Sequence, residues 1–433
     1  MIFEQLQRFR QIIYECLGKG KDATFELMDA ALTSPSISSF VSLSQNPLFR
    51  RKWPSIYTAL NDGQIYRGKL RKYLVNQIET ESQPILGGDS STWLRPEART
   101  LKDRGFHHNG SQGVGIGHSY STLAWIPEGE GSWVLPLRHE RITSFETALT
   151  KASFQLKQVC RQLKIRPLAV FDRNYGNASF LKQTAEISAD LLIRVASNRC
   201  VYDKPGAYLG RGAPRKHGHK FKLNDPQTYP EPEEIVEADD PKLGQIRVTR
   251  WSQFHFRNCV TRDMDIIRVE IVKPKGRRRN FQPLWLIWTG QTRPLLSQLW
   301  RQYLQRFSLE HWYRFAKQRL FWTKPQISSH HACESWCDLV LLMSWQLWFA
   351  RLECADSPLP WQSSQTILSP GRVAQAFPTI IASIGTLAKP PKTRGKSPGR
   401  PKGHFPPPRP RYPTVKKRVS RRKKSQTKTK VTA

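Results

Sequence analysis

The residue types best suited to chemistry lie closest together in one stretch, YLQRFSLEHWYRFAK, which runs from Tyr303 to Lys317. Tyr303, Arg306 and Lys317 stand at positions −7, −4 and +7 relative to Glu310. Because an α-helix turns by about 100° per residue, these four side chains are predicted to fall within roughly a 60° arc of one face. A carboxylate between two cations and a phenol suits a metal ion and a phosphodiester. The alternative is a solvated helix face with an Arg–Glu pair at i,i+4.

Two more carboxylates are predicted at strand ends. PILGGDSSTW contains a short apolar run that ends near Asp89, and RPLAVFDRNYGN contains an apolar strand that ends at Asp172. Carboxylates at the tips of neighbouring strands can meet a third one, Glu310, at one sheet edge. Three hard oxygen donors suit Mg²⁺ or Mn²⁺ rather than zinc, and such a site can hold two ions about 3.5–4 Å apart. Taken singly, either aspartate fits a turn or a cap better.

The elements that must position these residues predict a mixed α/β fold. From Gln83 onward three strands are followed by helix, strand, helix and strand, which implies a mixed sheet covered by helices. Residues 198 to about 280 interrupt this order as a β-rich insertion. QPLWLIWTG is a further strand, and Pro294 opens one long helix that carries Glu310. A last buried helix is predicted at about 335–354.

Composition and periodicity divide the chain into four segments. Residues 1–80 follow a helical spacing and carry a basic stretch at 67–72, which predicts a DNA-binding domain, while a helical cap on the next domain is equally open. Residues 81–355 form the predicted catalytic domain, and residues 356–388 a C-terminal extension. Residues 389–433 hold seventeen Lys and Arg and no Asp or Glu, so they are predicted to be disordered when free and to bind phosphate non-specifically.

The charge balance limits the partners of the chain. With 69 Lys and Arg against 34 Asp and Glu, the formal net charge is +35, and such an excess favours a polyanion such as nucleic acid. The best apolar run, residues 339–350, is shorter than the roughly 20 residues that cross a bilayer, so no membrane partner is expected. The seven scattered cysteines favour reduced thiols in the cytoplasm.

Together these motifs resemble those of the DDE transposases of bacterial insertion sequences, in the group marked by a Y-R-E-K signature. Y-x2-R-x3-E-x6-K matches residues 303–317 at every spacing, and FDRNYGN is similar to the second-aspartate motif of that group. The resemblance covers roughly residues 83–350. It implies a ribonuclease-H-like fold with a β insertion before the glutamate. It also implies hydrolytic nicking of transposon ends and attack of the freed 3′-hydroxyl on target DNA.

The resemblance also implies a role for each matching residue. It implies that Asp89, Asp172 and Glu310 are the catalytic ligands of two Mg²⁺ or Mn²⁺ ions. It implies DNA-backbone contacts for Arg173, Tyr303, Arg306 and Lys317. Trp285, in PLWLIWT, is similar to a family tryptophan that stacks on a flipped base, although this chain lacks one residue of that motif and a core position is the alternative.

The implied partners are double-stranded DNA at terminal inverted repeats and at the target site, bound by a dimer at the nucleoid of a prokaryotic cytoplasm. Two other functions stay open at this point. One is a catalytically inactive, transposase-derived DNA-binding protein. The other is a metal-dependent nuclease without strand transfer, which would release cut DNA but yield no joined product.

Overall fold

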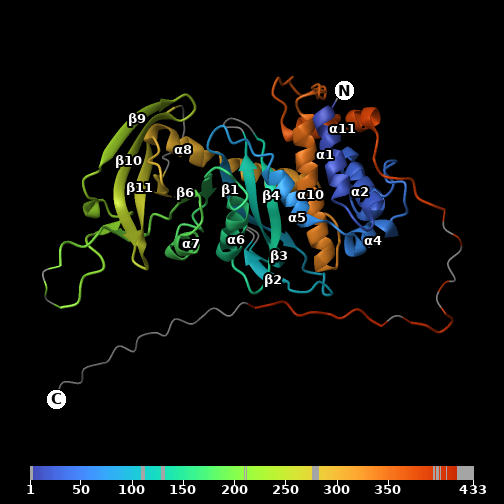
Figure 1. Ribbon diagram of the computed structural model, residues 1–433, viewed down its shortest axis with the longest axis horizontal. Helices are drawn as coiled ribbons and strands as arrows, with labels where there is room; N and C mark the ends of the chain where they lie inside the picture. The colour runs from blue at the N-terminus through green and yellow to red at the C-terminus, as the bar shows by residue number, and fades with distance from the viewer. Residues whose placement is uncertain are drawn as a thin grey trace, which may run out of the picture.

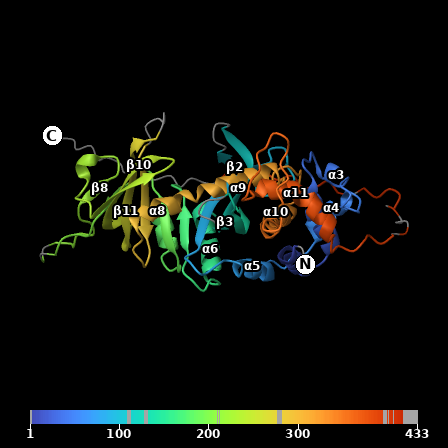
Figure 2. The same ribbon diagram turned by 90° about the horizontal axis from the view of Figure 1, so that it is seen from above.

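The structure of the chain is a computed structural model that describes residues 3–108, 113–127, 132–208, 210, 212–275, 282–393, 395, 399, 401–405 and 407–416. Its elements lie along one long axis (Figure 1). The N-terminal helices lie at one end and the strands of residues 200–274 at the other, with the rest of the sheet between them (Figure 2). Within these described ranges, no helix is long and apolar enough to cross a membrane.

A mixed sheet of twelve strands, counted over the described residues, forms the centre of the fold. Its order is β2-β3-β1-β5-β6-β12-β11-β10-β7-β8, with β4 paired to β3 and β9 paired to β10. The β1–β5 and β5–β6 pairs are parallel, whereas the β1–β3 and β6–β12 pairs are antiparallel. The predicted mixed α/β fold is therefore confirmed, and it is consistent with the ribonuclease-H-like class. The strands up to the insertion are β1 (Ile85–Leu94), β2 (Gly105–His108), β3 (Val114–Ile126), β4 (Leu135–Ile142), β5 (Leu168–Phe171) and β6 (Asp190–Arg194).

The β-rich region that follows Arg194 extends the same sheet instead of folding apart from it. A long antiparallel ribbon of β10 and β11 pairs through β11 with β12, and β12 pairs with β6. The insertion is therefore continuous with the central sheet through backbone hydrogen bonds. Its strands are β7 (Cys200–Tyr202), β8 (Lys220–Lys222), β9 (Glu234–Asp240), β10 (Gly244–Phe256) and β11 (Cys259–Pro274), and the sheet resumes at β12 (Leu284–Thr289).

The predicted single helix from Pro294 is wrong, because the chain forms two helices there. These are α8 (Leu296–Leu304) and α9 (Phe307–Gln318). At the junction the amide of Arg306 donates to the carbonyl of Tyr303, and the amide of Leu309 donates to the carbonyl of Arg306. These i→i+3 bonds tighten the chain relative to an α-helix. As a result, Tyr303 lies in the last turn of one helix, Arg306 lies at the junction, and Glu310 lies in the first turn of the next helix.

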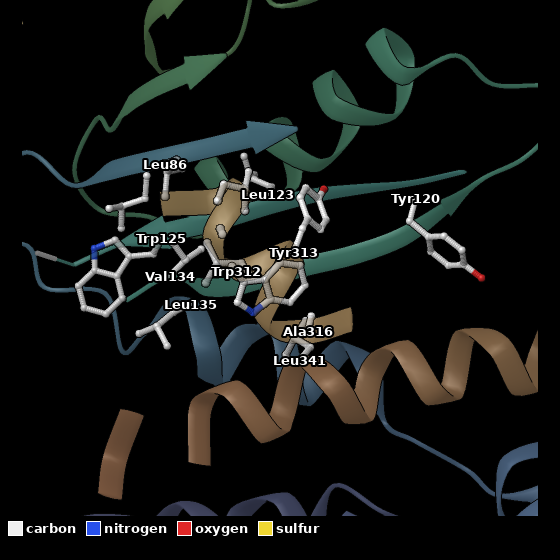
Figure 3. Packing of buried hydrophobic residues seen from close by; sticks show 14 of the residues in the cluster. Leu86, Tyr120, Leu123, Trp125, Val134, Leu135, Trp312, Tyr313, Ala316 and Leu341 are labelled. Carbon is white, nitrogen blue, oxygen red and sulfur yellow. The ribbon is translucent and has the colours of Figure 1, made fainter. Parts of the chain in front are cut away.

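Helix α9 lies between the sheet and the long helix α10 (His330–Ala350). Trp312 and Ala316 are buried on its α10 side, near Leu341, while Tyr313 lies nearer to the sheet (Figure 3). Leu86 and Leu123 belong to the same buried cluster. Burying large apolar side chains contributes about 1.5–3 kcal/mol each, so this packing fixes the face of α9 that carries Glu310. On the other side of the sheet lie α6 (Ala148–Cys160) and α7 (Ala178–Gln183).

The N-terminal helices pack directly on α10. Arg10 and Asp29 form a buried ion pair at 2.7 Å, and the same guanidinium donates to Gln346 Oε1 on α10 at 2.6 Å. Arg67 and Arg71, two cations of the basic stretch, form ion pairs with residues of α10 and β4. These contacts support the helical-cap alternative, and DNA binding by this segment stays a prediction. The helices are α1 (Glu4–Glu15), α2 (Lys21–Thr33), α3 (Phe40–Leu43), α4 (Pro54–Asp62) and α5 (Arg67–Val75).

The chain beyond residue 355 returns to the body of the protein twice. Helix α11 (Pro370–Ile384) packs on α2 and α10. Within the basic tail, residues 407–416 then run along the sheet and form a bridge to β2 at Gly105. In Figure 1 this red segment passes below the sheet on the side of β2. Residues 417–433 lie outside the described residues, so the disorder predicted for them is not addressed.

Candidate active site

The two aspartates lie side by side because of the register of two parallel strands. Gly88 on β1 pairs with Phe171 at the end of β5, so the next residues, Asp89 and Asp172, emerge at the same level. Asp89 lies within β1, which continues to Leu94 and pairs there with β3, whereas β5 has already ended. The sheet is therefore open on one side of Asp89, and this opening gives the two carboxylates their shared space.

Each aspartate is also held by its own local hydrogen bonds. The amide of Ser90 donates to Asp89 Oδ1 at 2.7 Å. The amide and the side chain of Asn174 donate to the two oxygens of Asp172 at 2.9 and 3.0 Å, which forms a turn directly after β5. Such side-chain-to-backbone bonds are typical of aspartate in turns. Asp172 therefore belongs to a turn and also lies beside Asp89, while its role as a metal ligand stays a prediction.

The third carboxylate joins this pair through an arginine. Arg306 Nη2 lies 2.6 Å from Glu310 Oε1, and Arg306 Nη1 lies 3.3 Å from Asp89 Oδ2. The Arg306 residue is only 4% exposed, while the Glu310 side chain is 50% exposed. The i,i+4 pair of the solvated-face alternative is thus present, but its cation points into the protein. The guanidinium supplies positive charge between the carboxylates of β1 and α9.

Burial perturbs both aspartates, and repulsion from Asp172 adds to the shift of Asp89. Burial, and then the nearby charge of Asp172, raise the pKa of Asp89 to about 6. Burial also raises the pKa of Asp172, although Arg306, Arg173 and Arg194 oppose the shift. A raised pKa means that the ionised pair lacks enough positive charge around it. The pair is therefore suited to a cation that can be bound and released.

A second layer of side chains positions Asp89 from behind. The hydroxyl of Tyr313 lies 3.0 Å from the backbone carbonyl oxygen of Asp89 and 2.8 Å from Thr122 Oγ1. Thr122 Oγ1 in turn lies 2.8 Å from Nδ1 of His139, and burial lowers the pKa of His139 to about 3. These groups were not predicted from the sequence. The only hint was that Tyr313 lies three residues after Glu310 and so on the adjacent face of the helix.

The predicted DNA contacts fall into three different environments. Tyr303 is fully buried beside Arg306, and burial raises its pKa. Lys317 lies two turns beyond Glu310, with its Nζ 5.7 Å from the ring centre of Trp322, and burial lowers its pKa. Arg173 directly follows Asp172 and lines a cavity of about 530 Å³. Of the four predicted DNA-contacting residues Arg173, Tyr303, Arg306 and Lys317, the two whose charge acts on the aspartates are therefore Arg173 and Arg306.

The same cavity includes Trp285, which lies on β12. Trp285 is 3% exposed, and its ring stacks on Trp251 with a centroid distance of 5.9 Å. The guanidinium of Arg268 lies 5.5 Å from the Trp285 ring, and Arg194 also lines the cavity. Most of the Trp285 surface is thus buried in the core, as the alternative interpretation held. The small part that remains accessible faces a basic cavity next to Asp172.

The donor set fits hard divalent cations in chemistry, though not yet in arrangement. Asp89 and Asp172 provide half-buried carboxylate oxygens with raised pKa values, and Mg²⁺ and Mn²⁺ prefer such oxygen ligands. Within the part of the chain that the structure describes, no group of three or more His, Cys, Asp or Glu residues is close enough to hold a metal ion. The third carboxylate, Glu310, does not join the two aspartates directly because its side chain is paired with Arg306. A ligand set of all three carboxylates requires Glu310 to exchange that partner.

Comparison with curated proteins finds no match for this chain. A protein family described as DDE superfamily endonuclease matches residues 13–257. The match includes helices α2 to α5, Asp89 and Asp172, and it ends before Glu310. It spans more than half of the chain, and the two aspartates of the carboxylate pair lie within it. The chain therefore belongs to the DDE superfamily of endonucleases, whose members cut DNA and generally use divalent metal ions.

Proposed function

We propose that this endonuclease is a DNA transposase of the Y-R-E-K group of bacterial insertion sequences. It cuts phosphodiester bonds at the terminal inverted repeats of its element and joins the freed 3′-hydroxyl to target DNA. The observation that carries the proposal is the Arg306 contact, which links Asp89 to Glu310 although Arg306 and Asp89 are 217 residues apart in the chain. Asp89 and the Y-R-E-K segment were two separate grounds for the resemblance. In the structure they come together beside Asp172.

In this proposal Asp89, Asp172 and Glu310 are the ligands of two divalent ions, Mg²⁺ or Mn²⁺. When bound, such ions activate an attacking oxygen and stabilise the leaving oxygen of an in-line displacement at phosphorus. The contribution of the chain itself is to position the carboxylates before metal binds. The paired register of β1 and β5 fixes the two aspartates, and the Tyr313 hydroxyl fixes the backbone of Asp89. Glu310 stands on a separate helix, so it can turn while the aspartates stay in place.

Arg306 has two roles in this scheme. Before metal binds, its guanidinium offsets the charge of Asp89 and Glu310. If Glu310 were a metal ligand, the guanidinium of Arg306 would be free to offset charge that develops on the phosphoryl group. Tyr303 is buried against Arg306, so we assign it the support of that guanidinium rather than a direct grip on DNA. Lys317, farther along α9, is assigned to the DNA backbone beyond the scissile bond.

The basic cavity beside Asp172 is proposed to bind DNA next to the cut. Arg173, Arg194 and Arg268 contribute positive charge to it, and Trp285 contributes an aromatic edge. Arginine guanidinium groups bind phosphate well, and aromatic rings stack on bases without strong sequence preference. Two transposon ends must be handled together, so we expect a dimer on double-stranded DNA.

The test uses duplexes that carry the inverted repeats flanking the coding region, with and without Mg²⁺. The parent protein is expected to nick these ends and, when target DNA is added, to give a joined product. Asp172→Ala should do neither, whereas the exposed control Asp62→Ala on α4 should act like the parent. Equal cutting by Asp172→Ala would refute the assignment.

The same assay separates the other two functions. A nuclease without strand transfer would cut the ends and yield no joined product at any target concentration. A catalytically inactive DNA-binding protein would retain the labelled ends in a gel shift but would leave them uncut with either metal. The intact set of three carboxylates supports the transposase over the inactive alternative.

A further inference from the structure

The segment of residues 407–416, here named the strap, lies at the open edge of the sheet and forms one β-bridge with it. β2 is the last strand of the sheet on its side and pairs only with β3 among the named strands. The amide of Val415 donates to the carbonyl of Arg104 at 2.7 Å, and Val415 forms a parallel bridge with Gly105. The amide of Tyr412 donates to the carbonyl of Arg99 at 2.8 Å. Unpaired backbone N–H and C=O groups at a sheet edge can form hydrogen bonds with an added extended segment in this way.

Two side-chain hydrogen bonds also join the strap to the body. Arg104, only 3% exposed, donates to the carbonyl of Tyr412 at 3.4 Å and to the carbonyl of Pro96 at 2.6 Å. Arg409 of the strap donates to Ser328 Oγ at 3.2 Å. Val415 also lines two adjoining cavities of about 420 and 450 Å³. The buried Arg104 thus donates hydrogen bonds both to a carbonyl of the body and to a carbonyl of the strap, which indicates a specific docking site.

The position of the dock relative to the carboxylates follows from the strand registers. Gly105 of β2 pairs with Gly117 of β3, and Gly117 pairs with Leu94 at the end of β1. Leu94 lies five residues beyond Asp89, which corresponds to about 17 Å along the strand. The strap thus lies near the end of β1 that extends past the open side of the carboxylate pair.

The sequence that follows the strap is strongly basic. Residues 417–433 contain eight Lys and Arg and no Asp or Glu. A chain of that length can span at most about 56 Å, which is enough to reach DNA bound at the carboxylates. Among the described residues before the strap, the last one tied to the body is Lys389, whose amide donates to Asp22. If the strap is released, the tether to the middle of the basic stretch therefore lengthens about fourfold.

We propose that the strap is an intramolecular anchor, which docks on β2 and thereby keeps the basic end of the chain beside the DNA that the endonuclease cuts. Because it takes DNA as the partner, this inference rests on the proposed function. A fourfold longer tether lowers the effective concentration of the basic stretch by roughly eightfold, since that concentration falls as the −3/2 power of tether length. Release of the strap should thus weaken DNA binding without any change in charge.

The test compares Val415→Pro with the matched control Thr414→Pro in the full chain. Proline at 415 removes the amide that donates to Arg104, whereas the structure shows no hydrogen bond from the amide of Thr414. Hydrogen exchange of the Tyr412 amide reports docking directly. We expect it to be protected in the parent and in Thr414→Pro, and to exchange at least about tenfold faster in Val415→Pro.

DNA binding is then measured for the same three proteins over a range of salt. Val415→Pro should bind a duplex roughly eightfold more weakly, with the same slope of log K against log salt, because the number of charges is unchanged. Unprotected Tyr412 in the parent would overturn the docking, and equal DNA affinity of an undocked Val415→Pro would overturn the anchoring role. Protection that rises with protein concentration would mean docking between two copies and would also overturn the proposal.

The two inferences fail in different ways. If no protein binds or cuts DNA while Tyr412 is protected, the proposed function is wrong and the dock is real. If the parent cuts DNA while Tyr412 exchanges freely, the proposed function stands and the strap does not.

Discussion

Asp89→Asn is expected to make the protein more stable in the absence of metal at the same time as it abolishes cutting. The pKa of Asp89 is about 6 in the folded protein and 3.8 in the unfolded reference. Because the pKa is raised on folding, the protonated Asp89 carboxyl favours the folded state. Its contribution to the free energy of unfolding is fully present below pH 3.8 and is lost as the pH rises through about 6. The difference between these two pKa values means that ionised Asp89 lowers the free energy of unfolding by about 3 kcal/mol at pH values well above 6.

The shift already includes the attraction between Asp89 and Arg306, because that attraction is one of its causes. The asparagine side chain can still accept the bond from the Ser90 amide, so little else is lost. We therefore expect Asp89→Asn to raise the free energy of unfolding by about 1–3 kcal/mol at pH 8, with the gain vanishing towards pH 4. At roughly 2–4 °C per kcal/mol, the melting temperature should rise by several degrees.

The assay is urea unfolding in EDTA at pH 5, 6.5 and 8, followed by the same series with Mg²⁺. Mg²⁺ should stabilise the parent more than Asp89→Asn, since binding to the folded state adds RT ln(1 + [Mg²⁺]/Kd). Asp190→Asn is the matched control at the opposite end of β5 and β6, where Arg166 Nε lies 2.5 Å from the carboxylate. That variant should lose stability. The reasoning is refuted if Asp89→Asn is less stable than the parent at pH 8, or if its gain does not depend on pH.

Three further changes test the site and its support. Glu310→Gln keeps the size of the side chain but removes a metal ligand, so cutting should fall by at least about a hundredfold while a gel shift shows DNA binding within about twofold of the parent. Arg306→Ala leaves two carboxylates without their cation, so we expect weaker cutting, weaker DNA binding and lower stability in urea, and unchanged DNA binding would contradict its role at phosphate. Arg10→Met breaks the buried pair with Asp29 that joins the N-terminal helices to α10. It should cost about 3–5 kcal/mol in urea unfolding, against almost nothing for the exposed control Arg8→Met.

Local patterns were enough to predict the fold class and the family. The apolar runs that became β3, β4 and β5 were visible because each is buried along most of its length, and β1 was visible from its buried start at Leu86–Gly88. The mixed sheet is confirmed, and membership of the DDE superfamily is confirmed by the match over residues 13–257. Assignment to the Y-R-E-K group stays a prediction, as do the roles of the individual site residues.

Other features depended on contacts between distant segments and could not be predicted. The spacing of Tyr303, Arg306 and Glu310 suggested one helix face, yet the chain forms two helices with Arg306 at their junction. No periodicity reports that Arg306 will be buried against a carboxylate 217 residues away, because its position depends on how α9 packs on β1. The support of Asp89 by Tyr313, Thr122 and His139 likewise exists only once β3, β4 and α9 are assembled.

What the sequence determined by itself was the chemistry: the three carboxylates, the cations at fixed spacings and the excess of positive charge. These follow from residue type and local order, which do not change on folding. What only the tertiary structure decided was how that chemistry is held. Burial and the parallel register of β1 and β5 create the repulsion between the aspartates, Arg306 relieves it, and an open sheet edge binds part of a tail that composition alone predicted to be disordered when free.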